Sequence, residues 1–330
     1  MKKIVLFGLA VVLALTLVSC GGKKDKKVIK IGIVVPATQS VAVALEQKFK
    51  PMIEEKIPGA EVQLFTDGVL GGEKELFDSV RDGKLDIIVI GSSFWSEIPQ
   101  ILITDFPFLY RDVDHAQKVY NGEVGQEIAK LLLDKTGIRL LAWGPNGARV
   151  FSSGKQLTKL ADFKGQKIRM PNNPLHVQMA KALGANVIIM PMGEIFTSLE
   201  QKVIDGQDNP MRTLVSYGWY EVQKYVYLTN HMVASLEILG SPQFWDSLTP
   251  EQQTIVNEAA QATSDYAWEI YKASIAEDEL FLKDHNLVVT APTLAEQNQM
   301  QALVGPIYNN YIYKEYPWAK ELVQKARAVK

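Results

Sequence analysis

The amino-acid sequence predicts an α/β fold of two lobes, each a β-sheet flanked by helices, with one long helix bracing both lobes. Short β-branched runs alternate with amphipathic stretches over residues 28–90, which is the rhythm of a parallel α/β sheet. The same alternation restarts near residue 137 and indicates a second unit of this class. A helical pattern over residues 250–284 is longer than one small domain. The 330 residues leave room for two domains of ordinary size.

The first lobe is predicted to contain strands that alternate with helices. Each predicted strand is rich in β-branched residues, and each predicted helix places apolar residues at helical spacing. Pro36 ends the first strand, and Pro58-Gly59 ends the first helix. The predicted strands are residues 28–35, 61–65 and 85–90, and the predicted helices are residues 40–56 and 73–82.

The second lobe is predicted from the same signals. Gly144-Pro145-Asn146-Gly147 has the composition of a turn and separates its first two strands. Phe163-Lys164-Gly165 similarly precedes the third strand. The predicted strands are residues 138–143, 149–152, 167–170 and 186–190, and the predicted helices are residues 176–183 and 194–203.

The long helix has a clear start signal. Thr249 with Gln252 three residues later forms a capping box, and Pro250 occupies the first helical position. Apolar residues then recur at steps of three or four as far as residue 284. A helix of this length spans about 50 Å and could reach both lobes. A break near Ala273-Ser274 is the alternative.

Composition argues against several functional classes. A formal net charge of −2 does not suit nucleic-acid binding, which selects basic surfaces. The four histidines show no metal-binding spacing, and the sequence lacks the GxSxG, Walker and GxGxxG motifs. We therefore predict no enzyme activity, no cofactor and no metal site.

The N-terminus has the pattern of an export signal. Lys2 and Lys3 precede a mostly apolar run over residues 4–18, which is too short to span a bilayer. Leu17-Val18-Ser19-Cys20 resembles the bacterial lipobox, which implies that Cys20, the one cysteine, carries a lipid. We predict a signal peptide at residues 1–19, a lipidated tether at residues 20–28, and a periplasmic, membrane-anchored protein. The alternative is a plain signal peptide that contains a cysteine.

Several segments occur in the order found in one known family. Together they resemble the DctP-like solute-binding proteins of tripartite ATP-independent periplasmic (TRAP) transporters. The resemblance extends over about residues 30–290. Its segments are Gly68–Leu76, Val80–Asp86, Asp105–Asp112, Phe163–Pro171, and Pro191–Leu199 with Val203–Pro210.

The resemblance implies a periplasmic-binding-protein-like fold that closes on a small organic carboxylate. It also implies a pair of integral membrane subunits that receive the ligand. It places the chain crossovers near residues 147 and 234. One lobe would then comprise residues 29–146 plus 235–275, and the other residues 147–234 plus 276–330.

Two residues are the main candidates for the acid group of the ligand. Arg169 lies at the end of a predicted strand, and a guanidinium pairs bidentately with a carboxylate. The resemblance implies that it is the principal carboxylate-binding residue. Asn209 carries an amide that donates and accepts, and the family has an asparagine at this position. The alternatives are a surface arginine beside Lys167 and a turn asparagine before Pro210.

Other residues are weaker candidates. Arg149 opens a strand and resembles a second ligand-binding arginine of some family members, with an interdomain salt bridge as the alternative. Asn172 follows Pro171, and the alternative is a plain loop residue. Two further groups complete the set of candidates. One group follows the third predicted strand, at the edge where α/β sheets bind ligands, and the other lies in the second lobe. For each aromatic residue among them, core packing is the alternative. The residues of the two groups are Ser92, Phe94, Trp95, Met192, Tyr217 and Trp219.

The ligand and the rival functions are also constrained. Met170, Met190, Met192 and Met211 lie near the proposed site in sequence, which favours an acid with an apolar body. Core packing is the alternative for at least two of them. A sensory lipoprotein that binds the same ligand is one rival function. A secreted hydrolase is another, with Asp205 and Asp208 as its nearest acidic pair.

Overall fold

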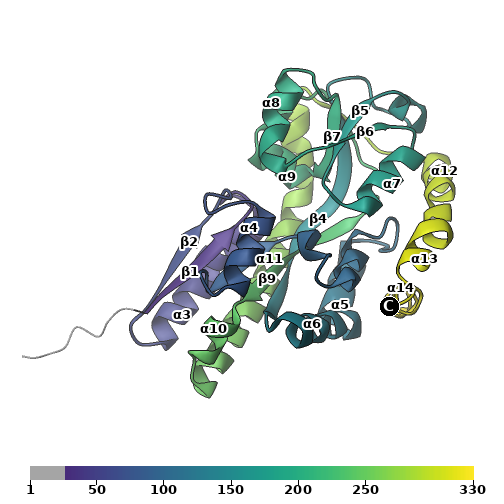
Figure 1. Ribbon diagram of the computed structural model, residues 1–330. Coiled ribbons are helices and arrows are strands. Elements are labelled where there is room, and N and C mark those ends of the chain that lie inside the picture. The colour runs from purple at the N-terminus through teal and green to yellow at the C-terminus, as the bar shows by residue number, and fades with distance from the viewer. Residues whose placement is uncertain (1–26) are drawn as a thin grey trace, which may run out of the picture.

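The computed structural model describes residues 27–330 and shows two lobes built on one mixed sheet (Figure 1). The predicted signal peptide and Cys20 lie outside the described residues. The strand order is β2-β1-β3-β9-β4-β7-β5-β6, with β8 beside β4 and β10 beside β8. The strands are β1 Lys27–Ile33, β2 Ala60–Phe65, β3 Ile87–Ile90, β4 Arg139–Ser153, β5 Lys167–Met170, β6 Asn186–Ile189, β7 Gly206–Pro210, β8 Tyr225–Tyr227, β9 Val233–Gly240 and β10 Val288–Thr290.

The first lobe is built on β2, β1, β3 and β9. The first three strands are parallel, as expected for βαβ units, and β9 runs antiparallel between β3 and β4. The predicted helix over residues 40–56 is confirmed, with a π-helical turn at Leu45–Phe49 before Pro51. Residues 27 and 28 belong to β1 and not to the predicted tether. The helices are α2 Ser40–Ala44, α3 Lys50–Lys56, α4 Glu73–Arg81, α5 Val113–Asn121 and α6 Glu123–Thr136.

The second lobe is built on β7, β5 and β6 (Figure 1). β5 lies parallel to both β6 and β7, and β7 runs antiparallel to β4. Strand β7 was not predicted, because its sequence Gly-Gln-Asp-Asn-Pro has the composition of a turn. The segment is extended because it pairs with β4. The helices are α7 Pro174–Ala182, α8 Ile195–Glu200 and α9 Met211–Ser216.

The predicted turn at residues 144–147 is wrong, because β4 runs without interruption from Arg139 to Ser153. It passes from the first lobe into the second. Its pairing with β9 shifts register between Leu140 and Ala142 and again between Pro145 and Gly147. A bulge accommodates the proline, which has no N–H for the ladder, so turn-forming residues are retained inside a strand.

Gly147 is required where β4 crosses between the lobes. Its φ is +119°, and a Cβ at this position would lie 2.3 Å from the Tyr271 hydroxyl. The Gly147→Ala variant is expected to lose about 2 kcal/mol of unfolding free energy or more, because backbone strain and a clash coincide. Urea denaturation would measure the loss. Gly165→Ala is the control, since its φ is +80° but nothing lies within 4 Å of the added Cβ. Equal losses in both variants would contradict the role of the Tyr271 contact.

The long helix α11 extends unbroken from Pro250 to Asp284, so a break near residue 273 does not occur. Its capping box is confirmed by reciprocal hydrogen bonds between Thr249 and Gln252, at 3.3 and 3.0 Å. Near its middle, Trp268 Nε1 donates to Trp143 O in the first lobe at 3.1 Å. Further along, Asp278 pairs with Arg212 of α9 in the second lobe at 2.8 Å. The helix therefore contacts both lobes.

The C-terminal segment folds across the two lobes (Figure 1). α12 (Leu294–Val304) contacts α7 of the second lobe, whereas α14 (Ala319–Ala328) contacts α6 and the 3-10 segment Pro99–Asp105 (η3) of the first. The expected lobe boundaries stay a prediction, and these contacts favour the first lobe for α14. Within residues 27–330, none of the helices combines the length and apolar character needed to span a membrane.

Candidate functional site

Three predicted ligand residues lie on neighbouring strands of the second lobe. Arg149 lies on β4, Asn209 on β7 and Arg169 on β5, and these strands are adjacent in the sheet. All three side chains are buried. The order of the strands in the sheet therefore brings these three residues into one region, although they are more than 15 positions apart in the sequence.

Arg169 is a buried cation held by a carbonyl group. Only 4% of the residue is exposed, and its Nε and Nη2 donate to Met190 O at 3.0 and 2.8 Å. Neither contact is with a carboxylate. Burial lowers the pKa of Arg169 to about 10, although Asp208 and Glu73 act in the opposite direction. A buried charge without a carboxylate partner is costly, and an anionic ligand would relieve that cost.

Arg149, by contrast, has a complete internal partner. Its Nε lies 2.8 Å from Asp208 Oδ2, and its Nη2 lies 3.0 Å from Asp208 Oδ1 and 2.6 Å from the Asp208 carbonyl. Arg149 lies on the part of β4 that pairs with β7, and Asp208 lies on β7 itself, so this pair lies within the second lobe and is not an interdomain bridge. His231 Nε2 approaches the same carboxylate at 3.2 Å. Burial alone would raise the pKa of Asp208, but Arg149, His176 and His231 hold it well below its usual range.

Asn209 belongs to a chain of polar side chains. Its amide donates to Gln207 Oε1 at 2.7 Å, and Gln207 donates to Ser152 Oγ at 2.8 Å. Side chains alternate along β7, so Asn209 and Gln207 lie on one face and Asp208 on the other. In the part of the chain that the structure describes, no hydrogen bond joins Asn209 to Arg169 directly. A ligand could contact both residues at the strand ends.

The first-lobe candidates divide into polar and core residues. Ser92 donates from its hydroxyl to Asp105, a buried carboxylate at the end of η3. Phe94 stacks on Phe77 at 5.2 Å and is buried in the core, which favours packing over ligand contact. Trp95 is half-buried against the same core.

The second-lobe candidates show a similar division. Trp219 is buried and stacks on Tyr217 at 5.0 Å, while the Tyr217 hydroxyl reaches Val34 O of the first lobe at 3.4 Å. Met192 is only partly covered by the second-lobe core. Asn172 is exposed, so its place in the site stays a prediction.

Buried polar residues that join the lobes were not predicted from the sequence. Asn173 of the second lobe donates to Asp105 of the first at 2.8 Å, and Gln39 of the first donates to Thr213 of the second at 3.0 Å. His176 lies 3.2 Å from Asp105. Asp105 opens one of the segments that carry the family resemblance, but its charge inside an apolar stretch was the signal that went unused.

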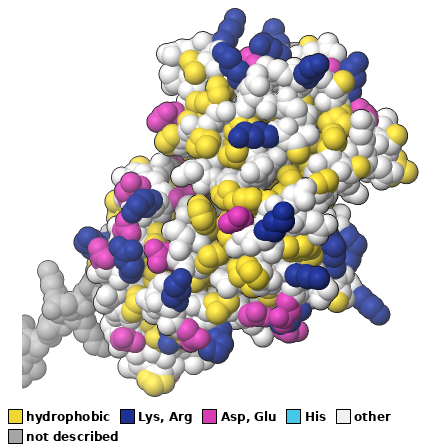
Figure 2. Space-filling view, turned by 45° about the vertical axis from the view of Figure 1, so that its right-hand side comes forward, with side chains coloured by type: hydrophobic (Ala, Val, Ile, Leu, Met, Phe, Trp, Pro, Cys, Tyr) yellow, Lys and Arg dark blue, Asp and Glu magenta, His cyan; other side chains and the backbone are white. Residues whose placement is uncertain are grey.

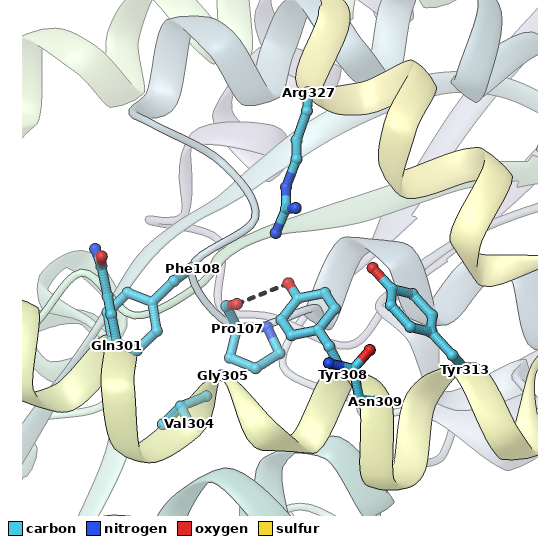
Figure 3. Close-up of a pocket in the computed structure, with 9 residues that line it drawn as sticks. All are labelled: Pro107, Phe108, Gln301, Val304, Gly305, Tyr308, Asn309, Tyr313 and Arg327. Atoms are coloured by element: carbon cyan, nitrogen blue, oxygen red, sulfur yellow. Dashed lines mark hydrogen bonds between the residues drawn. The ribbon is translucent and has the colours of Figure 1, made fainter.

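A separate cavity of about 360 Å³ lies between the Pro107-Phe108 loop and the C-terminal segment (Figure 3). Arg327 lies over the Tyr308 ring, 5.5 Å from its centroid, and Tyr308 donates to Pro107 O at 2.8 Å. The cavity is lined by none of the predicted ligand residues.

Figure 2 shows hydrophobic side chains across the middle of the visible face, with charged ones scattered around them. The buried polar region between the lobes is therefore the better candidate for an acid-binding site.

Comparison with known proteins identifies the family of this chain. Residues 31–315 match the DctP family, described as bacterial extracellular solute-binding protein, family 7. The chain is 33% identical over 254 residues to the 2,3-diketo-L-gulonate-binding periplasmic protein of Escherichia coli K12, which covers 76% of each protein.

Solved structures are also similar along nearly the whole chain. A TRAP periplasmic solute-binding protein of Haemophilus influenzae with bound L-gulonate is 35% identical, has a TM-score of 0.88, and is matched over 92% of this chain and 100% of its own. A TRAP periplasmic solute-binding protein of Pseudomonas putida F1 with bound D-glucuronate is 30% identical and has a TM-score of 0.84. The match covers 92% of this chain and 97% of that protein.

Proposed function

This chain belongs to the DctP family of bacterial extracellular solute-binding proteins, and on that basis we propose that it captures a small hydroxylated organic acid between its lobes. The observation that carries the proposal is Arg169, a buried guanidinium whose hydrogen bonds within residues 27–330 go to one carbonyl oxygen. A carboxylate placed against it would gain two charge-assisted hydrogen bonds and supply the missing countercharge.

The surroundings of Arg169 favour a hydroxylated ligand over one with an apolar body. Met170, one of the methionines that favoured an apolar body, is fully buried in the hydrophobic core. Asn209 and Gln207 instead supply amide groups on β7, the strand beside Arg169, and Ser92 supplies a hydroxyl just after β3. The related proteins with bound L-gulonate and D-glucuronate agree with a sugar acid.

Binding would proceed by closure of the lobes. In an open form the acid reaches Arg169, and rotation about β4, β9 and α11 then brings the first lobe over it. Closure excludes water, which strengthens the pairing of the two charges. Direct contacts between lobes, such as Gln39 with Thr213 at 3.0 Å, would add to the closed form.

The cellular setting follows from the family and from the N-terminal sequence. We propose a periplasmic location, a lipid on Cys20 that ties the protein to a membrane, and delivery of the ligand to the integral membrane subunits of a TRAP transporter. The Leu-Val-Ser-Cys motif supports the lipid. A sensory lipoprotein is the nearest alternative, since it would use the same binding chemistry.

An enzymatic function has less support. Members of the family bind solutes, and the acidic pair of a hydrolase would have to be free to act on a substrate. Asp208 is occupied by Arg149, and Asp205 accepts from the Lys167 amide and pairs with Lys155, both at 2.8 Å. We therefore propose a binding protein without catalysis.

Native mass spectrometry of the protein purified from its own host would test the ligand class. We expect a bound small acid with several hydroxyl groups, recovered chemically unchanged. A branched or aliphatic acid would contradict the hydroxylated class, and a converted product would contradict binding without catalysis. The intact mass of the same preparation would show whether Cys20 is the lipidated N-terminus.

A further inference from the structure

Asp105 of the first lobe is a buried carboxylate that residues of both lobes contact. From its own lobe it accepts a hydrogen bond from the Ser92 hydroxyl. From the second lobe, Asn173 Nδ2 donates to its Oδ2 at 2.8 Å, and His176 Nε2 lies 3.2 Å from its Oδ1. Asp105, Asn173 and His176 are 3%, 6% and 2% exposed. Charge-assisted contacts this deeply buried are strong enough to affect how the lobes associate.

His176 continues the contact to a second carboxylate. His176 Nδ1 lies 3.3 Å from Asp208 Oδ2, but the two atoms are not aligned well enough for a hydrogen bond. The same oxygen accepts a hydrogen bond from Arg149 Nε. A neutral imidazole would turn a lone pair toward one of the two carboxylates. Only the protonated ring offers a donor to each. Burial opposes that charge, but Asp105 and Asp208 outweigh it and raise the pKa of His176.

The loop that follows Asp105 is held by further contacts, and Figure 3 shows the one between Tyr308 and Pro107. Tyr308 of the C-terminal segment donates to Pro107 O, and the Phe108 amide donates to His231 O at 2.8 Å. Phe108 has a φ of +54°, a conformation that persists only where surrounding contacts impose it. Asp105 therefore presents its carboxylate to α7 from a defined position.

We propose that Asp105, Asn173 and His176 form a latch between the lobes that stabilises the closed form, and that His176 must be protonated for the latch to hold. The proposal rests on the proposed function and deepens it by naming what regulates closure. The latch residues act as positioning residues. They connect the first lobe to Asp208, the partner of Arg149, without contacting the ligand carboxylate.

The latch gives closure a pH dependence of defined sign. Opening removes His176 from Asp105, so the closed form binds the histidine proton more tightly than the open form. The closed form is therefore favoured at low pH and weakened as pH rises through the closed-state pKa of His176. The groups facing the ring are Asp105 and Asp208, with Arg149 and His231 behind Asp208.

Small-angle X-ray scattering without added ligand would test the latch through the radius of gyration. Asn173 also caps α7 by accepting from the Leu175 amide at 2.9 Å, and Ser and Asp cap helices equally well. Asn173→Ser replaces the amide donor to Asp105 with a shorter hydroxyl, and Asn173→Asp replaces it with a repelling carboxylate. We expect the closed-to-open ratio to fall roughly tenfold or more in Asn173→Asp, the size expected when a hydrogen bond to a charged group is lost.

The control is Asn186→Asp, because Asn186 is an exposed asparagine of the same lobe that donates to Gly165 O at 3.2 Å.

A second experiment tests the histidine. The wild type should open as the pH rises from 6 to 9, and His176→Gln should not show this pH-dependent opening. Unchanged scattering in Asn173→Asp and an unchanged pH response in His176→Gln would overturn the latch. The dissociation rate of L-gulonate, used as the probe, should rise in Asn173→Asp. If the wild type does not bind this probe, the proposed ligand class fails while the scattering result still decides the latch.

Discussion

Replacing Arg169 by alanine is expected to weaken binding of the acid ligand by about 3 kcal/mol or more, which is at least about a hundredfold in Kd. The ligand carboxylate would be buried in the closed form without its countercharge. Isothermal titration calorimetry with the ligand recovered from the host protein would measure the loss. Arg169→Lys keeps the charge but not the planar pair of donors, so we expect an intermediate affinity.

The same variant should not be less stable when no ligand is bound. Arg169 bonds to Met190 O rather than to a carboxylate, so its removal relieves the cost of a buried charge. Urea denaturation should therefore show equal or higher stability. Arg81→Ala is the control, because Arg81 is exposed on α4 and pairs with Asp78 at the surface. Unchanged ligand affinity in Arg169→Ala would remove Arg169 from the site.

Replacing Asp208 by asparagine is expected to have the opposite signature, a loss of about 3–5 kcal/mol in unfolding free energy. The substitution keeps the side-chain shape but leaves Arg149 buried without a negative partner. Urea denaturation would measure the loss. Asp78→Asn is the matched control, since Asp78 pairs with Lys74 and Arg81 at the surface and such pairs contribute less than about 1 kcal/mol.

A double variant separates the pair from its surroundings. If the unpaired Arg149 charge causes the loss, Arg149→Met should recover part of it in the Asp208→Asn background. No recovery would place the cause in the contacts of Asp208 with His176 and His231. A loss below 1 kcal/mol in Asp208→Asn itself would contradict the account of the buried pair.

Acid should reduce the difference between wild type and Asp208→Asn. The pKa of Asp208 is held well below its usual value in the folded protein, so the carboxylate stabilises the fold above its unfolded-state pKa of about 3.9. As pH falls from that value toward the folded-state pKa, this contribution is lost. The two proteins should therefore approach each other in stability only in this acidic range.

Local sequence signals were sufficient for some of the regular elements, but not for β7. The capping box at Thr249 and the spacing beyond it predicted a helix from Pro250 to about residue 284, because helix ends and faces are set by nearby residues. They left open a break near Ala273-Ser274, which α11 does not have. The same reasoning failed for β4, where Pro145 and Gly147 are typical of a turn. Only pairing with β9, which is distant in sequence, keeps these residues extended.

The site was predictable in part for the same reason. Arg169 was found because a strand end, a guanidinium and a family resemblance coincide there. Asp105 and His176 were not predicted: the charge of Asp105 within an apolar stretch was overlooked, and His176 has an ordinary sequence context. Their importance comes from a contact that forms only when two lobes fold and meet. Arg149 was predicted to contact the ligand, but nothing in its sequence context indicated that Asp208 would occupy its guanidinium.

A crystal structure of the protein with the ligand recovered from its host would test the central claim most directly. The account predicts that a carboxylate of the ligand accepts two hydrogen bonds from the Arg169 guanidinium, with the hydroxylated body between the lobes near Asn209 and Ser92. A ligand whose acid group binds elsewhere, with Arg169 still bonded only to Met190 O, would contradict it.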